Sequence, residues 1–304
     1  MTWIDNLKEN VNARLQKLVG NSTATNVKID EIEEGIIKRK HELLKKRRSE
    51  LVKAMASGQI IGQKKVDNTL IIDYIVHNQL LVKQQNDNFY MEENLEPRRA
   101  VIHKNIIIKD SISESENTDR YLQPTFKLED IEETRRGVRQ GYRYERRAAV
   151  QYAEKWWNSY NPKYKKFEVD CTNYVSQCLH EGGRIPMTDA SSRNKGWWYN
   201  GTSWSYSWAV AHSLRWYLSG ARNGIVAKEV SSASDLIPGD IICYDFQGDG
   251  RWDHNTIVVA KDQNNEPLVN AHTYNSRMRY WAYEDSTAYT PNIRYKFFHI
   301  LDSE

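Results

Sequence analysis

The sequence predicts an α+β protein in which helices and strands are segregated along the chain. Residues 3–56 repeat apolar side chains every three to four positions, which is typical of amphipathic helices. Residues 69–108 are rich in β-branched and aromatic residues, and short turn sequences interrupt them. After residue 140 the same order returns, with helical patterns first and short apolar strands afterwards. Runs of helices followed by runs of strands favour an α+β fold.

The N-terminal part is predicted to contain two helices and a β-meander. The helices are expected at residues 3–18 and at about 30–56. The strands are expected at residues 69–82, 89–91, 100–102 and 106–108. Gln85-Asn86-Asp87-Asn88 reads as the turn between the first two strands. We assign residues 1–115 to a first, smaller domain without a chemical motif, and residues 116–143 to a linker.

The second domain, residues 144–304, begins with helices and ends with strands. One helix is predicted from Tyr144 to near Asn158, and another begins at Cys171. A tryptophan-rich segment then leads into a further helix. Strands are expected at residues 241–244, 254–260, 267–273 and 297–301. Asn264-Asn265 reads as a hairpin turn, so the second and third of these strands are expected to be antiparallel neighbours.

Composition and charge exclude several classes of function. Lysine and arginine total 43 against 40 acidic residues, so the charge gives no reason to expect nucleic acid as a partner. No stretch approaches the roughly 18 apolar residues that a membrane span needs, and the N-terminus lacks a signal-peptide pattern. The default compartment is therefore the cytoplasm, while export by a non-standard route stays open. Three cysteines, an odd number, favour free thiols over a disulfide framework.

Cys171 is the candidate nucleophile. Asp170 is a natural N-cap, which places Cys171 in the first turn of a helix. The unpaired N–H groups and the dipole of that turn stabilise an anion. We therefore expect a lowered pKa for the Cys171 thiol and a larger fraction of thiolate, which is the reactive form. Cys178, two turns later, and Cys243, in an apolar strand, are expected to lie in the core.

A cysteine nucleophile also needs a base and a group that orients the base. His254 opens an apolar strand after a polar loop, so we expect its ring at a sheet edge, paired as an imidazolium with the Cys171 thiolate. Asn270 and His272 alternate onto one face of the next strand, and either could hydrogen-bond His254. We prefer His272, because an imidazole reaches further, and keep Asn270 as the alternative.

Five segments follow one another in order within residues 145–300: Asp170 to Gln177, Ser207-Trp208, Pro238-Gly239-Asp240, Asp253-His254 and Ala271-His272-Thr273. Together they resemble the putative amidase domain family found mainly in Gram-positive bacteria. That family is similar to the papain-like hydrolases, including the NlpC-type cell-wall peptidases and the CHAP amidases. The resemblance implies an antiparallel sheet packed against the Cys-bearing helix, with Cys171 as nucleophile and His254 as base. It also points to His272 as the third residue, and it implies hydrolysis of amide bonds, usually in peptidoglycan stem peptides.

Substrate contacts are expected from Asp170 and from the tryptophan-rich segment. Trp197, Trp198 and Trp204 are candidate walls of a substrate cleft, with core packing as the alternative. We expect no cofactor and no metal. The acidic loop before His254 lacks the alternating spacing of a calcium loop, so its aspartates read as turn residues: Asp245, Asp249 and Asp253.

Two other functions remain open at this stage. The first is a catalytically silent module whose aromatic cleft binds a peptide or a glycan, while residues 1–140 dock a protein partner. The second is an intracellular peptidase or acyltransferase that uses Cys171 and His254 with an acceptor other than water. A reactive thiol at Cys171 would separate both enzymes from the silent module.

Overall fold

The computed structural model describes residues 2–20, 29–113, 141–189, 192–221 and 223–303. The chain forms two units, Met1–Tyr121 with Tyr283–Thr287, and Leu122–Ala282 with Ala288–Glu304. The predicted linker, residues 116–143, lies outside the described ranges apart from residues 141–143. Every strand pair given for the described residues is antiparallel, which confirms an α+β fold with antiparallel strands. Within those ranges, no helix is long and apolar enough to cross a bilayer.

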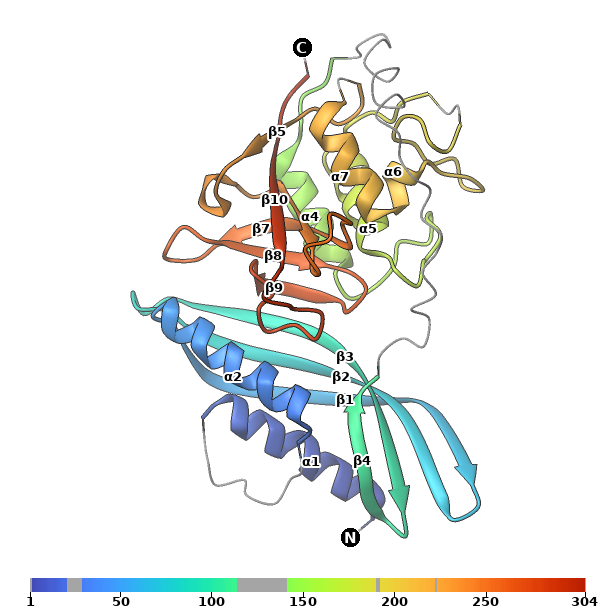
Figure 1. Cartoon of the computed structure of the whole chain (residues 1–304), viewed down its shortest axis with the longest axis vertical. Coiled ribbons are helices and arrows are strands. Elements are labelled where there is room, and N and C mark those ends of the chain that lie inside the picture. Colours follow the sequence, from blue (N-terminus) through green and yellow to red (C-terminus); the bar gives the residue numbers. More distant parts are fainter. Residues whose placement is uncertain (1, 21–28, 114–140, 190–191, 222, 304) are drawn as a thin grey trace. The chain divides into compact units, whose positions relative to one another are not determined.

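The first unit consists of two helices and a four-stranded meander (Figure 1). Its elements are α1 (Trp3–Leu18), α2 (Glu31–Lys46), β1 (Glu50–Val66), β2 (Thr69–Lys83), β3 (Phe89–His103) and β4 (Ile106–Ile112). Consecutive strands pair with one another, in the order β1-β2-β3-β4. The predicted meander is therefore present, and the two short segments expected at 89–91 and 100–102 form one long strand, β3.

The second helix is ten residues shorter than the sequence pattern predicted. It ends at Lys46, and Arg48 takes a positive φ of 51°, which turns the chain out of the helix. Residues from Glu50 onward then alternate between the two faces of β1. Leu51 and Met55 fit the helical period by chance, since both lie in β1, where Leu51 is buried and a register shift after it leaves Met55 exposed.

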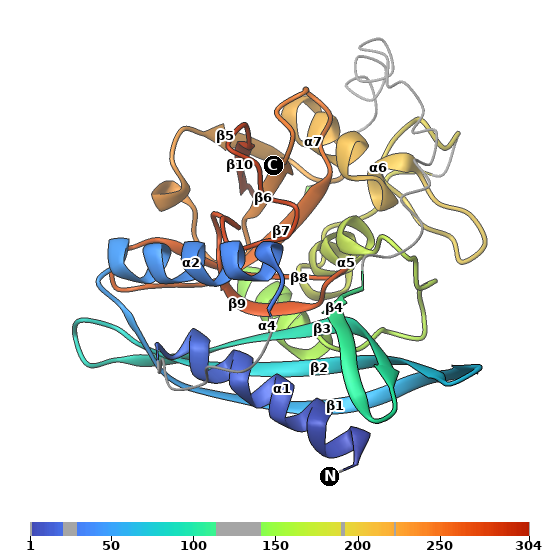
Figure 2. The ribbon, with the colours of Figure 1, turned by 60° about the horizontal axis from the view of Figure 1, so that its bottom comes forward.

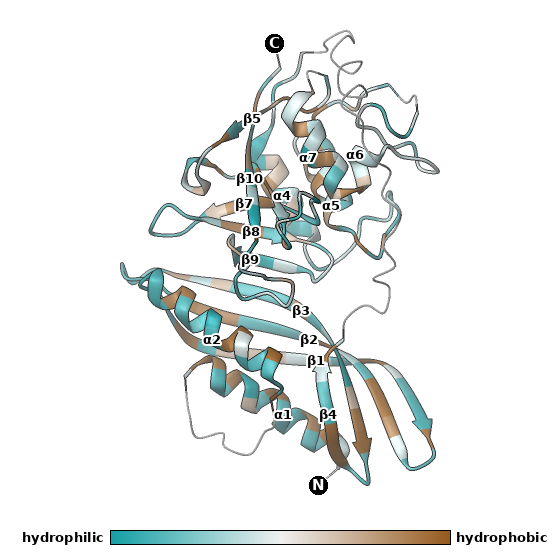
Figure 3. Ribbon diagram, viewed as in Figure 1, coloured by the Kyte–Doolittle hydropathy of each residue, from teal (hydrophilic) through white to brown (hydrophobic). Residues whose placement is uncertain are grey.

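The core of this unit lies between α1 and the sheet. Leu7 of α1 packs into a cluster of strand residues: Ile72, Tyr74, Val76, Ala100 and Ile102. Figure 3 shows both hydrophobic and hydrophilic segments along the strands. Buried and partly exposed positions alternate along β2, as expected for a sheet with one face against helices. The remaining polar side chains on this face need partners, because burial of an unpaired polar group is costly.

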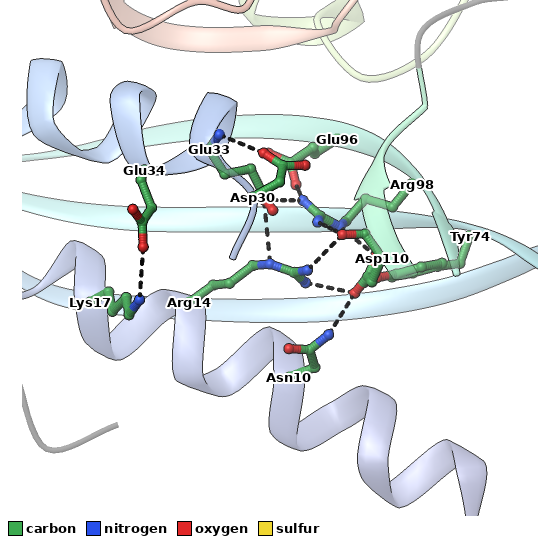
Figure 4. A network of polar contacts seen from close by, with 10 residues as sticks. All are labelled: Asn10, Arg14, Lys17, Asp30, Glu33, Glu34, Tyr74, Glu96, Arg98 and Asp110. Atoms are coloured by element: carbon green, nitrogen blue, oxygen red, sulfur yellow. Dashed lines mark hydrogen bonds and ion pairs between the residues drawn. The ribbon is translucent and has the colours of Figure 1, made fainter. Parts of the chain in front are cut away.

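A buried network of charged side chains supplies those partners around Asp110 of β4 (Figure 4). The Asp110 carboxylate accepts hydrogen bonds from Asn10, Arg14, Tyr74 and Arg98. Glu33 of α2 forms ion pairs with the same two arginines, at 3.3 Å from Arg14 and 2.7 Å from Arg98. The network connects both helices to the sheet, and it leaves the buried Asp110 charge compensated.

In the second unit, helices pack against an antiparallel sheet whose strands are not ordered as they are in the chain. Its helical elements are α4 (Arg146–Trp156), α5 (Cys171–Gln177), a π-helical turn (Cys178–Gly182), α6 (Tyr206–Ala209), α7 (Ala211–Gly220) and a 3₁₀ turn (Ala233–Asp235). Its strands are β5 (Ala227–Val230), β6 (Ile241–Asp245), β7 (His254–Lys261), β8 (Pro267–Ala271), β9 (Ser276–Tyr280) and β10 (Arg294–Ile300). The strand order within this unit is β9-β8-β7-β6-β10-β5. The predicted helix that begins at Cys171 and the strand that begins at His254 are both present.

The core of the second unit lies between the helices and β6–β8. Helices α4, α5 and α7 all contact β7, and Figure 2 shows α4 and α5 beside β7 and β8. Val175 of α5 and Leu214 of α7 share a cluster with Ile241 and Ile257 of the sheet. All three cysteines are free thiols, and Cys178 and Cys243 are completely buried in this core. The expectation that these two cysteines are core residues is confirmed.

Gly182→Ala should destabilise the second unit by about 1–3 kcal/mol, because overpacking forces neighbours apart. A Cβ at this position would lie 2.7 Å from Cα of Ala149 and 2.8 Å from the carbonyl oxygen of Ala148, both backbone atoms of α4. Urea unfolding followed by tryptophan fluorescence measures the change. Gly58→Ala is the matched control, because nothing lies within 4 Å of its Cβ, and its effect should stay within about 0.5 kcal/mol. Equal stability of Gly182→Ala and wild type would contradict the close approach.

Candidate active site

Cys171 is the first residue of α5, and its sulfur faces the start of β7. The sulfur lies 3.7 Å from the Thr172 hydroxyl, and the backbone N–H of Asn255 is close enough to favour a thiolate. Asn255 directly follows His254, so the structure brings the candidate nucleophile to the strand end that carries the candidate base. The Cys171 side chain is covered by its neighbours, and the residue is only 1% exposed.

Burial raises the pKa of the Cys171 thiol, and the Asp170 carboxylate raises it further. The N–H of Asn255 and the hydroxyl of Thr172 act in the opposite direction, because both donate to a thiolate. The expectation of a lowered pKa is therefore wrong for this structure. Removal of the sulfur from water outweighs the short helix, which spans only Cys171–Gln177.

His254 is the first residue of β7, and its ring packs among aromatic side chains. Its backbone pairs with Tyr244 of β6, and the two rings lie 5.6 Å apart between centroids. The Phe246 ring lies 6.1 Å away. Successive side chains of a strand point to opposite faces. The His254 ring therefore leaves β7 on the face opposite to the Asn255 side chain, which reaches Thr172 of α5.

The same burial lowers the pKa of His254 to about 3, with a smaller contribution from the positive charge of Arg279. His254 is 9% exposed, and an imidazolium there would lose most of its hydration. With a raised pKa at Cys171 and a lowered pKa at His254, both groups are neutral at pH 7. The expected thiolate–imidazolium pair is thus replaced by a neutral thiol and a neutral imidazole.

His272 holds Asp170, the residue before the candidate nucleophile. Its Nδ1 lies 2.7 Å from the Asp170 carboxylate, and its Nε2 lies 2.8 Å from the backbone oxygen of Trp156. The ring also stacks on Tyr174 at 4.0 Å. The contacts of His272 therefore fix the start of α5 against α4 and the end of β8.

Neither candidate for the third residue hydrogen-bonds His254 among the described contacts. Both nitrogens of His272 are occupied as above. Asn270 donates to Glu154 at 2.8 Å and accepts from the N–H of Met278 at 2.9 Å. Both side chains lie on the helix-facing side of the sheet, whereas the His254 ring lies with Tyr244. The predicted shared face of Asn270 and His272 is present, but the group that orients the base stays a prediction.

Asp170 itself does not act as the expected side-chain cap. Its carboxylate accepts from Asn173 and from the N–H of Phe167, in addition to His272, and makes no capping bond to α5. Asp170 is also 1% exposed, which leaves it no surface for a substrate. The contacts of Asp170 anchor the start of α5. The expectation that Asp170 binds substrate does not agree with its burial.

The tryptophan-rich segment contributes mainly to the core. Trp197 is completely buried, and its indole N–H donates to Ser176. Trp198 is also buried, so both residues have no surface to offer to a ligand. Trp204 is half-buried and packs edge-on against Phe167 at 4.8 Å. Core packing, the alternative, therefore describes Trp197 and Trp198, and Trp204 remains as a candidate cleft wall.

Two polar residues near the sulfur escaped the sequence analysis. Asn255 donates from its carboxamide to the Thr172 hydroxyl at 2.9 Å, and both side chains are buried. A signal for Asn255 was present, because it shares a strand face with the core residues Ile257 and Val259. A polar side chain at such a position requires a buried partner.

The acidic loop before His254 is a turn rather than a cation site. The Asp245 carboxylate accepts hydrogen bonds from the N–H groups of Gly248, Asp249 and Gly250. Asp253 accepts from the N–H of Phe246, while burial raises its pKa to about 6. These bonds shape the approach to β7, as the turn interpretation predicted. Among the described residues no group of three acidic, histidine or cysteine side chains is placed to hold a metal.

Comparison with known families identifies the second unit. The model of the family described as "Putative amidase domain" matches residues 143–298, which include Cys171, His254 and His272. This chain belongs to that family. Membership indicates a hydrolase that acts on amide bonds. The matched region coincides with the resemblance seen in the sequence, and residues 1–142 lie outside it.

Two relatives from Bacillus subtilis (strain 168) share parts of this sequence. The uncharacterized protein YhbB is 49% identical over 270 residues, which cover 88% of this chain and 86% of that protein. The uncharacterized protein YjcM is 34% identical over 137 residues, which cover 42% of this chain and 30% of that protein. The match to YhbB extends beyond the amidase domain, so both units of this family member occur together in a relative. No solved structure matches the chain.

Proposed function

We propose that this chain is a cysteine-dependent amidase in which Cys171 is the nucleophile and His254 is the base. The observation that carries the proposal is a chain of polar contacts: the Cys171 sulfur lies 3.7 Å from the Thr172 hydroxyl, which accepts a hydrogen bond from the side chain of Asn255, the residue that follows His254. These contacts support a pairing of the cysteine that begins α5 with the histidine that opens β7. Membership of an amidase family supports amide bonds as the substrate.

The reaction would start from two neutral groups. His254 takes the thiol proton as the sulfur attacks the amide carbon, which avoids a stable ion pair in a buried site. His254 then protonates the leaving amine, and water, activated by the same ring, releases the acyl group. The backbone N–H of Cys171 is a donor for the oxyanion. In the described geometry the His254 ring lies against Tyr244, on the face of β7 opposite to the Asn255 side chain, so the start of β7 must rearrange before the ring can take the thiol proton.

We further propose a papain-like arrangement and a peptide substrate from peptidoglycan. A buried helix that begins with cysteine and packs on antiparallel strands supports the first part. The sequence resemblance to cell-wall peptidases supports the second. Trp204, half-buried beside Phe167, is the tryptophan that remains available as a wall for such a peptide.

Trapping the acyl intermediate tests the covalent mechanism. Purified peptidoglycan is incubated with the full chain, with and without hydroxylamine, and the soluble products are identified by mass. Hydrolysis through an acyl-enzyme should give new carboxyl ends in water and hydroxamates in hydroxylamine, because the amine competes with water for the acyl group. A protein that forms only new acyl–amine bonds with added amines is an acyltransferase instead. Absence of any cleaved amide contradicts the peptidoglycan proposal.

A second candidate is a catalytically silent domain that binds a peptide or glycan, with residues 1–140 available to a protein partner. The burial of the Cys171 sulfur and the position of the His254 ring favour it. Incubation of purified peptidoglycan with wild type and with Cys171→Ala separates the candidates. Cleavage that is lost in Cys171→Ala supports the amidase, whereas binding without cleavage by both proteins supports the silent domain.

A further inference from the structure

Thr172 and Asn255 form a polar bridge between the start of α5 and the start of β7. The Asn255 carboxamide nitrogen donates to the Thr172 hydroxyl oxygen over 2.9 Å. Neither side chain is accessible to solvent beyond 1% of its surface. Burial of a hydroxyl and an amide costs free energy unless the two groups form hydrogen bonds with each other or with a third group.

The third group is the Cys171 sulfur, which lies 3.7 Å from the Thr172 oxygen. A hydroxyl has one hydrogen and two lone pairs. Because the Asn255 amide occupies one lone pair, the hydroxyl hydrogen is left for the sulfur. In the neutral thiol either atom can be the donor, but a thiolate has no hydrogen and can only accept.

We propose that Thr172 and Asn255 are positioning residues that hold a hydroxyl donor against the Cys171 sulfur and so favour its anionic form. The inference rests on the proposed function, in which Cys171 reacts as a nucleophile. When the thiol proton passes to the base, the sulfur keeps two donors, the Thr172 hydroxyl and the Asn255 N–H. These donors offset the burial and the Asp170 charge, which both disfavour the anion.

Alkylation of Cys171 in Thr172→Val tests this directly. Valine keeps the shape of threonine but has no hydroxyl, so one donor to the thiolate is lost. The alkylation rate with iodoacetamide is followed by peptide mass from pH 6 to pH 11. The midpoint of the rate profile should rise by about one pH unit, which is about a tenfold lower rate at any pH below it.

Conservative variants identify the cause of the shift. Thr172→Ser keeps the hydroxyl and should restore the wild-type midpoint. Asn255→Ala should raise the midpoint by a smaller amount, because the hydroxyl remains but is free to turn away from the sulfur. Thr256→Val is the matched control, since the Thr256 hydroxyl lies 3.1 Å from Tyr244 and away from the sulfur, and its midpoint should equal wild type.

A midpoint in Thr172→Val equal to that of wild type overturns the inference, as does an equal rise in Thr256→Val. Thermal melts establish that each variant is folded, and Asn255→Ala carries the test if Thr172→Val does not fold. The readout needs no substrate, so it is separate from the proposed function. If Cys171→Ala still cleaves amides while Thr172→Val shifts the midpoint, the amidase mechanism fails and the positioning role stands.

Discussion

Cys171→Ala should lose amide hydrolysis by a factor on the order of 10³ or more, because it removes the atom that forms the acyl bond. Cys171 lies in a packed site whose other groups stay in place: Asp170 remains held by His272, and Asn255 remains bonded to Thr172. The substitution therefore removes one atom without a change of fold. Release of peptide fragments from peptidoglycan, quantified by mass, measures the loss against wild type.

Cys178→Ala is the control for the loss of a thiol as such. Cys178 is completely buried in the core, seven positions along the same helical segment, and has no contact with the strand end that carries His254 among those described. Its variant should cleave at a rate close to that of wild type, at a modest cost in stability. Equal fragment patterns from Cys171→Ala and wild type would show that Cys171 is not the nucleophile of amide cleavage.

The second unit should lose stability on acidification through His254. Its ordinary pKa is 6.5, and burial lowers it to about 3 in the folded chain. Between these values the unfolded chain binds a proton at His254 and the folded chain does not, so the free energy of unfolding falls as the pH falls. At 1.36 kcal/mol per pKa unit, the full effect is roughly 5 kcal/mol. Urea unfolding at a series of pH values measures it.

Tryptophan fluorescence suits this measurement, because every tryptophan except Trp3 lies in the second unit. His254→Gln should flatten the dependence below pH 6.5, although the lowered pKa of the half-buried His212 leaves part of the slope. Asp253, with a pKa raised to about 6, contributes the opposite slope below that pH in both proteins. His41→Gln, at an exposed position of the first unit, serves as control. An unchanged slope in His254→Gln would show that His254 is not buried in its neutral form.

Local sequence patterns predicted the elements that position the site. The apolar period after Asp170 predicted a helix that begins at Cys171, and alternation predicted the strands of His254 and of Asn270. These predictions succeeded because helix and strand periods depend on neighbours in the chain. The end of α2 at Lys46 was missed, because Leu51 and Met55 continue the helical period although they lie in β1.

Properties that depend on distant packing could not be predicted in the same way. The direction of the Cys171 pKa is decided by burial under residues far along the chain, and the helix start alone suggested the opposite direction. The partners of His272 include the backbone oxygen of Trp156, which no side-chain motif reveals. The resemblance located the domain and its candidate nucleophile, while the hydrogen-bond network required the structure.

The burial of the Cys171 sulfur should also protect it from oxidation. Peroxide oxidises thiolates that it can reach, first to sulfenic acid and then irreversibly to sulfinic and sulfonic acids. A neutral thiol that is 1% exposed is a poor target for that attack. We expect the substrate-free protein to survive oxidising surroundings in which a permanently ionised, open cysteine would be destroyed.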